Sequence, residues 1–215
     1  MVCGLQRSAY QIMAGDAMNE LLSRLTLPLA LLLTACGGAT PAADREPPLA
    51  GARIGGPFAL IDQNGATVRD TDLAGKYRIL YFGYTYCPDI CPVDMQNIAA
   101  GMRLLEREDI DAARKVVPIF VTVDPERDSP AVLKEFVGNF HPRTIGLTGT
   151  PDAVAAMTKA HAVFAAKRES ADPDAYLVDH SRQSYLMGPQ GQPIALIPAD
   201  DSPRAIADTL KRWVR

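Results

Sequence analysis

The hydrophobic pattern of the chain alternates between strand-like and helix-like segments. Residues 77–84 and 116–123 are apolar at nearly every position, as strands are when helices cover both faces of their sheet. Beyond Pro92, apolar residues recur at helical spacing, at Met95, Ile98, Ala99, Met102 and Leu105. The pattern therefore predicts buried strands that are connected by helices.

Three later helices are each marked by a hydroxyl residue followed by proline. The pairs are Ser129-Pro130, Thr150-Pro151 and Ser202-Pro203, and each combines an N-cap with a residue suited to the first helical turn. The helix after Thr150 is predicted to run to about Lys167, and the last one to end near Val214.

Two hairpins complete the predicted fold. Residues 58–62 and 67–70 enclose Asn64-Gly65, which readily adopts the positive φ of a tight turn. Residues 176–180, 184–187 and 192–197 read as antiparallel strands with a turn at 188–191. The order of elements predicts an α/β protein with a thioredoxin-like fold, in which helices cover both faces of a central mixed β-sheet and an extra β-hairpin lies at the N-terminus.

The amino-terminal part of the chain differs in composition from the rest. A short apolar region ends at Leu33-Thr34-Ala35-Cys36 and is too short to span a bilayer, so residues 1–35 are predicted to be a signal peptide whose true start is Met18. The tetrad resembles a bacterial lipobox, which predicts lipidation of Cys36; an ordinary signal peptide cut near Ala35 is the alternative. Residues 36–54 would then tether the domain of residues 55–215 to a membrane.

Composition and cysteine count narrow the possible functions. The chain is 47% hydrophobic and 22% charged, with a formal net charge of −3, so no basic face points to nucleic acid as a partner. Of the four cysteines, Cys3 lies in the predicted signal peptide and Cys36 would carry lipid. Cys87 and Cys91 are therefore the only thiols expected in the exported domain.

These two cysteines lie between a predicted strand and a predicted helix. Pro88 and Pro92 disfavour a regular helix across the pair, so the helix is predicted to begin at Pro92. A structural disulfide would close only a short loop and would stabilise the domain little. A redox-active or metal-binding pair is favoured, because strand-to-helix corners are where α/β sheets place active groups.

The histidines add one candidate ligand to this pair. His141 and His161 fit ordinary surface or core residues, whereas His180 ends a predicted strand and opens a loop. Loops at strand ends often supply ligands, and they also supply ordinary polar residues, so the residues alone leave the role of His180 open.

Three segments of the chain resemble the signature segments of the Sco/SenC copper-chaperone family. They are residues 84–92, with the sequence YTYCPDICP, residues 123–130, with the sequence VDPERDSP, and residues 176–181, with the sequence YLVDHS. They occur in the order found in that family, and the resemblance extends from about Pro57 to the carboxy terminus. Tyr86 stands where the family commonly has histidine, which leaves the three implied ligands intact.

The resemblance implies a thioredoxin-like fold and a copper site formed by Cys87, Cys91 and His180. Two thiolates and an imidazole suit copper(I), and copper(II) with an added water or carboxylate is also implied. The implied function is that of a monomeric, extracytoplasmic copper chaperone. It would be lipid-anchored on the periplasmic side of a bacterial membrane, and it would pass copper from a donor protein to the binuclear copper centre of cytochrome c oxidase.

One alternative function remains at this point. It is a thiol-disulfide oxidoreductase that uses Cys87 and Cys91 to reduce the cysteines of an oxidase subunit or copper protein, although three residues separate the pair and a thioredoxin motif has two.

The role of Asp124, which follows a buried strand, is also open. It is either a turn or helix cap, or, as the resemblance suggests, a secondary residue near the copper loop.

Overall fold

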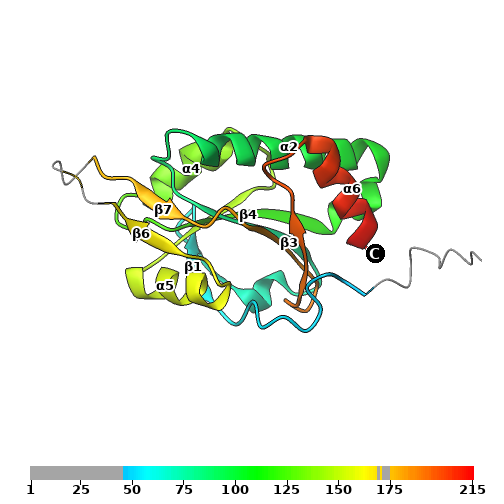
Figure 1. Ribbon diagram of the computed structural model, residues 1–215, viewed down its shortest axis with the longest axis horizontal. Helices are drawn as coiled ribbons and strands as arrows, with labels where there is room; N and C mark the ends of the chain where they lie inside the picture. The colour runs from blue at the N-terminus through cyan, green and yellow to red at the C-terminus, as the bar shows by residue number, and fades with distance from the viewer. Residues whose placement is uncertain (1–45, 169, 171–174) are drawn as a thin grey trace, which may run out of the picture. The chain divides into compact units, whose positions relative to one another are not determined.

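The computed structural model describes residues 46–168, 170 and 175–215 (Figure 1). The predicted signal peptide, the start at Met18, the lipidated Cys36 and the first part of the tether lie outside these residues. In the described part of the chain, no helix has the length and apolar character needed to cross a membrane.

Seven strands form one mixed sheet in the order β2-β1-β5-β4-β3-β8-β9. Strands β3, β4 and β5 are parallel at its centre, whereas β1 pairs antiparallel with β5 and β8 pairs antiparallel with β3. The predicted mixed sheet and the N-terminal hairpin of β1 and β2 are confirmed. The strands are β1 (Ala59–Asp62), β2 (Thr67–Arg69), β3 (Tyr77–Gly83), β4 (Val116–Thr122), β5 (Ile145–Thr148), β8 (Ser184–Met187) and β9 (Pro193–Ile197).

Helices cover both faces of this sheet, as the sequence predicts (Figure 1). On one face, Tyr81 of β3 and Phe120 of β4 belong to a buried cluster with residues of α2, α4 and α6. On the other face, Leu80 and Phe82 of β3 belong to a cluster with Val154 of α5. The helices are α2 (Ile90–Glu108), α3 (Ile110–Arg114), α4 (Pro130–Gly138), α5 (Pro151–Ala160) and α6 (Pro203–Trp213), and a 3-10 helix, η2, spans Asp70–Leu73.

The three predicted helix starts are confirmed by their caps. The side chains of Ser129, Thr150 and Ser202 each accept a hydrogen bond from the backbone N–H three residues later, and the next residue in each case is proline. The N-terminal N–H groups of a helix lack partners within the helix, so these caps stabilise α4, α5 and α6 where they begin.

The predicted extension of α5 to about Lys167 is wrong. The helix ends at Ala160, and Ala162 takes a positive φ of 53°, which turns the chain away from the helical path. The following residues form β6 (Ala165–Lys167), which pairs with β7 (Val178–His180) in a separate two-stranded sheet. Strand pairing with a distant segment thus overrides a local pattern that favours helix. The short elements α3 and β5 were not predicted from the sequence.

Residues 46–54, assigned to the tether by composition, make contacts with the domain. The backbone N–H of Leu49 donates to the carbonyl of Ile194 at 3.0 Å. The side chains of Leu49 and Ile54 also pack against the buried cluster beside α5. The edge strand β9 therefore has a neighbour along part of its length.

Candidate metal centre

The two cysteines lie where β3 gives way to α2. Cys87 is in the connecting turn and is partly buried, and Cys91 is fully buried. The predicted helix start at Pro92 is wrong, because α2 begins at Ile90 with Asp89 as its N-cap residue. Pro92 is tolerated because the first-turn N–H that proline lacks has no partner within the helix in any case. Cys91 therefore sits in the first turn of α2.

His180 joins the cysteines from the end of β7. Its Nε2 lies 3.4 Å from the Sγ of Cys91, and the Sγ of Cys87 accepts from the backbone N–H of Cys91 at 3.5 Å. One ligand atom from each of the three residues lies within 4.8 Å of the other two. The strand β7 thus places its last residue against the start of α2, and the three predicted ligands come together.

The other two histidines are buried and do not belong to this cluster. The Nε2 of His141 lies 3.2 Å from the carboxylate of Glu106. His161 is buried beside Phe82, with its Nδ1 2.9 Å from the carbonyl of Met157. Neither is placed with the cysteine pair.

The ring of His180 is held in the tautomer that a metal ligand needs. Its Nδ1 lies 2.9 Å from the carbonyl of Ser181, and a carbonyl only accepts, so Nδ1 carries the proton. Burial lowers the pKa of His180, which keeps the ring neutral at pH 7. Tyr84 packs edge-on against the ring at a centroid distance of 6.0 Å. The lone pair of Nε2 is therefore directed toward the sulfur atoms.

Cys91 is protonated at neutral pH in this metal-free state. Its burial raises the pKa of the thiol well above the ordinary range, and the neighbouring Cys87 adds to this effect. Burial also raises the pKa of Tyr81, which stays a neutral donor. A metal ion must therefore displace a proton from Cys91 to bind there.

Gly83 gives the sulfur of Cys91 its space. A Cβ atom at this position would lie 2.9 Å from Cys91 Sγ, 2.9 Å from the ring of Tyr81 and 3.2 Å from the ring of Phe120. Both rings are fully buried and have little room to move. The end of β3 thus needs the smallest residue so that α2 can approach it.

Replacing Gly83 with alanine is expected to lower stability by about 1–3 kcal/mol, the usual cost of overpacking a core, and to weaken metal binding by displacing Cys91. Urea unfolding and a copper(I) chelator competition would measure the two effects. Gly138→Ala is the matched control, because a Cβ there has no heavy atom within 4 Å. Equal stability of the two variants would contradict this account of Gly83.

A buried carboxylate behind the cluster was missed by the sequence reasoning. Asp94 of α2 is fully buried, and its carboxylate accepts from Tyr81 Oη at 3.1 Å and from Arg182 Nε and Nη2 at 2.9 and 2.6 Å. This bond network links the α2 turn that carries Cys91 to the residue two positions after His180. The sequence does contain a signal for this buried carboxylate, because Asp94 is an acidic residue on the apolar face of the predicted helix, one helical turn beyond Cys91.

The segment 123–130 supports the cysteine turn from the side. Asp128 is buried, and its carboxylate accepts from the backbone N–H and the hydroxyl of Thr85 at 3.1 and 2.6 Å. The hydroxyl of Thr122 also donates to Asp128, at 2.5 Å. Asp128 therefore fixes the residue two positions before Cys87, a role that sequence reasoning did not assign.

Asp124 lies in a neighbouring polar cluster and is not one of the three grouped ligands. It is buried, it forms an ion pair with Arg127 at 2.6 Å, and it accepts from the hydroxyl of Tyr176 at 2.7 Å. The guanidinium of Arg127 stacks over the rings of Tyr176 at 3.6 Å and Tyr86 at 4.8 Å. Asp124 thus connects the segment before β7 to the cysteine turn. Tyr86, which replaces the expected histidine, contributes an aromatic face to this stack.

Comparison with known proteins agrees with the fold and the site. The SCO1/SenC family model matches residues 46–215. Protein SenC of Rhodobacter capsulatus is 45% identical over 161 residues, which cover 75% of this chain and 71% of SenC. The structure of Bradyrhizobium japonicum ScoI with copper bound is 40% identical and has a TM-score of 0.68; the alignment covers 74% of this chain and 99% of ScoI.

A more distant structure carries the same fold. It is that of BsSco, described as a member of the Sco family of cytochrome c oxidase assembly proteins, in which a disulfide switch was identified. BsSco is 26% identical, with a TM-score of 0.57 over 73% of this chain and 90% of BsSco. The predicted fold is thereby confirmed as the thioredoxin-like Sco fold. Given this family match over most of its length, the chain belongs to the SCO1/SenC family.

Proposed function

We propose that this protein is a metallochaperone that binds copper(I) through Cys87 Sγ, Cys91 Sγ and His180 Nε2 and delivers it to the binuclear copper centre of cytochrome c oxidase. One observation carries the assignment of ligands, namely that these three atoms lie within 4.8 Å of one another. Atoms that bind one ion at about 2.0–2.3 Å can be at most about 4.6 Å apart, so little movement is needed to close the site. The copper-bound ScoI and the oxidase assembly role of the BsSco family support the proposal.

The donor set fits copper(I) better than other metals. Thiolates and a neutral imidazole are soft or borderline ligands, which copper(I) prefers, and a three-coordinate site is adequate for it. A structural zinc site would require a fourth protein ligand. Among the described residues, the metal-binding group contains three members. Copper(II) would need water or a carboxylate to complete its coordination.

The difference in burial between the ligands suits transfer to another protein. Cys91 is fully buried and His180 is partly buried, whereas Cys87 is in the turn before α2 and partly exposed. An incoming thiolate can reach the metal from the side of Cys87. We infer that Cys87 is the first ligand to be exchanged and that Cys91 and His180 hold the ion until the receiving ligands have bound.

We also infer that the chain works outside the cytoplasm, anchored to a membrane. The support is the sequence pattern alone: a signal peptide in residues 1–35, a lipobox ending at Cys36 and a tether before the domain. The proposed location is the periplasmic side of a bacterial membrane, with a copper donor and an oxidase subunit as partners and with the protein as a monomer. Mass spectrometry of the mature protein would test this proposal, because a diacylglycerol-modified Cys36 at the N-terminus is expected.

The copper stoichiometry of the reduced protein tests the main proposal directly. We expect about one copper(I) per chain after dialysis against a weak chelator, together with restored oxidase activity when the gene complements a deletion strain. A reduced, folded protein that retains no copper would refute the proposal.

Thiol-disulfide exchange is a second candidate function, because Cys87 and Cys91 are both free and adjacent. Burial of Cys91 and its raised pKa make this residue a poor attacking nucleophile. The His180→Ala variant separates the two functions, because His180 is not needed for disulfide chemistry. If that variant still supports oxidase assembly and Cys87→Ser does not, reductase activity is the function.

The affinity for copper(I) is expected to increase with pH. The thiol of Cys91 is protonated in the metal-free protein because burial raises its pKa, and this proton must leave when copper binds. Each proton released increases the apparent affinity about tenfold per pH unit below the thiol pKa. Competition with a copper(I) chelator at pH 6 and pH 8 measures the change. An affinity independent of pH would show that copper does not bind the Cys91 thiolate.

A further inference from the structure

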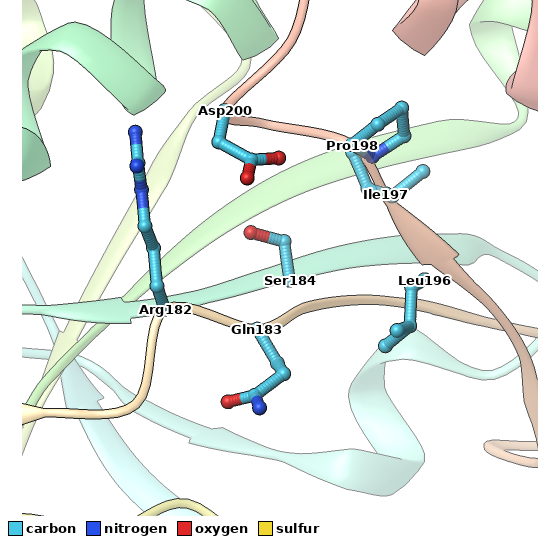
Figure 2. A pocket seen from close by; sticks show the side chains of 7 residues that line it. All are labelled: Arg182, Gln183, Ser184, Leu196, Ile197, Pro198 and Asp200. Carbon is cyan, nitrogen blue, oxygen red and sulfur yellow. The ribbon is translucent and has the colours of Figure 1, made fainter.

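A pocket of about 400 Å³ lies where β8 begins and β9 ends (Figure 2). It is lined by Arg182, Gln183, Ser184, Leu196, Ile197, Pro198 and Asp200. None of these residues belongs to the proposed copper site. The volume is within the range of about 300–1,000 Å³ that is common for ligand pockets. β9 is also the last strand of the sheet, and the pocket lies at its carboxy-terminal end, beyond Ile194, which bonds to Leu49.

The base of this pocket contains the buried hydroxyl group of Ser184. Ser184 is 1% exposed, and its Oγ has no hydrogen-bond partner among the described residues. Figure 2 shows this hydroxyl pointing into the space between Arg182 and Asp200. A buried hydroxyl that lacks a hydrogen bond is unfavourable, so Ser184 is suited to receive a polar group that enters the pocket.

The charges around the hydroxyl favour a cation. Arg182 is already neutralised, because both oxygens of the buried Asp94 accept from its guanidinium. Asp200 is exposed; it interacts electrostatically with Arg182, but among the described residues it forms no ion pair, since the guanidinium of Arg182 is paired with Asp94. With one cation and two carboxylates, the pocket and its supporting Asp94 carry a formal charge of −1. Leu196, Ile197 and Pro198 line the same space with apolar groups.

We propose that this pocket receives a lysine side chain from the protein that accepts copper, and this inference rests on the proposed chaperone function. The ammonium group donates to the carboxylate of Asp200 and to Ser184 Oγ, and the aliphatic stem lies along Pro198 and Leu196. Lysine fits better than arginine because the pocket offers one carboxylate without an ion pair and one hydroxyl. These two acceptors suit a compact ammonium group, whereas a planar guanidinium with five donors would keep donors without partners.

The position of the pocket explains what such a contact would do. Arg182 follows His180 by two residues, and it bonds to Asp94, one helical turn after Cys91. A lysine bound beside Arg182 would therefore hold the partner next to the copper ligands without occupying them. The contact would set the orientation of the partner and would leave copper binding itself unchanged.

The experiment titrates the ¹⁵N-labelled protein with Nα-acetyl-lysine methylamide and follows the backbone amide shifts. We expect saturable shifts at Ser184, Leu196 and Asp200. Nα-acetyl-norleucine methylamide is the matched probe, because it has the same stem without the ammonium group. Equal shifts with both probes would overturn the proposal.

Variants of the pocket sharpen this test. Asp200→Asn is expected to weaken binding of the lysine probe about fivefold, as for the loss of one ion pair. Ser184→Ala should also weaken it. Asp201→Asn is the control, because Asp201 is the neighbouring exposed carboxylate and does not line the pocket. If Asp200→Asn and Asp201→Asn bind the probe equally well, the proposal is wrong.

A cross-linking experiment addresses the partner in the intact system. Carbodiimide treatment of membranes during copper transfer should join Asp200 to a lysine of the copper-receiving protein. The Asp200→Asn variant should not form this cross-linked product and should transfer copper more slowly. Its copper stoichiometry should equal that of the wild-type protein. Copper transfer that proceeds without the cross-linked peptide would overturn the inference. Failure of copper binding itself would refute the chaperone function instead, and the probe titration would still report on the pocket.

Discussion

The His180→Ala variant is expected to fold but to bind copper(I) more than about 100-fold less tightly than the wild-type protein. Loss of a group that only orients a metal ligand typically costs about 10–100-fold in affinity, and loss of a ligand should cost more. His180 supplies the only nitrogen in the proposed site, and its Nε2 is 3.4 Å from Cys91 Sγ. Two thiolates alone would leave the ion open to competing chelators. Chelator competition under reducing conditions measures the change.

His141→Gln is the matched control for this variant. His141 is also buried and also contacts an acceptor, the carboxylate of Glu106, but it is not part of the metal-binding group. Its replacement should leave copper affinity unchanged, even if it costs some stability. Equal affinities of His180→Ala and the wild-type protein would show that the two sulfurs bind copper without the histidine.

The second large effect is expected at Asp94. Replacing it with asparagine should lower the free energy of unfolding by about 2–3 kcal/mol, because the charged carboxylate accepts three hydrogen bonds in a fully buried position. The asparagine side chain keeps the size but has one acceptor oxygen in place of two. The melting temperature should fall by about 5–10 °C for a domain of this size. Thermal and urea unfolding of the metal-free protein would measure both values.

Asp208→Asn provides the comparison for Asp94. Its side chain is 59% exposed and lies 3.6 Å from Arg204, so the change should cost less than about 0.5 kcal/mol. The Asp94→Asn variant should also weaken copper binding, because Asp94 bonds to Tyr81 behind Cys91 and to Arg182 after His180. If Asp94→Asn and Asp208→Asn unfold alike, the buried network does not contribute the stability inferred from its geometry.

The regular elements of this domain could be predicted from local sequence. The apolar runs 77–84 and 116–123 became β3 and β4, and the three hydroxyl-proline pairs became capped helix starts. These features depend on the burial pattern of neighbouring residues and on caps that act within one helical turn, so they can be read without a tertiary structure. The end of α5 could not, because β6 forms only where β7 pairs with it.

The candidate site could be predicted in part for the same reason. Cys87 and Cys91 are close in sequence and fall at a strand-to-helix corner, so their proximity follows from local structure. His180 could be proposed as their partner only through the family resemblance, since it lies 89 residues beyond Cys91. The supporting groups Asp94 and Asp128 were missed, because their side chains act through contacts with Tyr81 and Thr85 that cross the fold.

The sequence by itself determined the class of fold, the starts of α4, α5 and α6 and the one pair of thiols in the predicted mature domain. Those properties arise from hydrophobic periodicity, capping and residue type, all of which act over a few neighbouring positions. Only the tertiary structure decided that His180 Nε2 faces Cys91, that Gly83 makes room for the sulfur, and that the buried hydroxyl of Ser184 has no partner in the described part of the chain. These depend on where β7, β8 and α2 meet, and that arrangement comes from packing between segments distant in the chain.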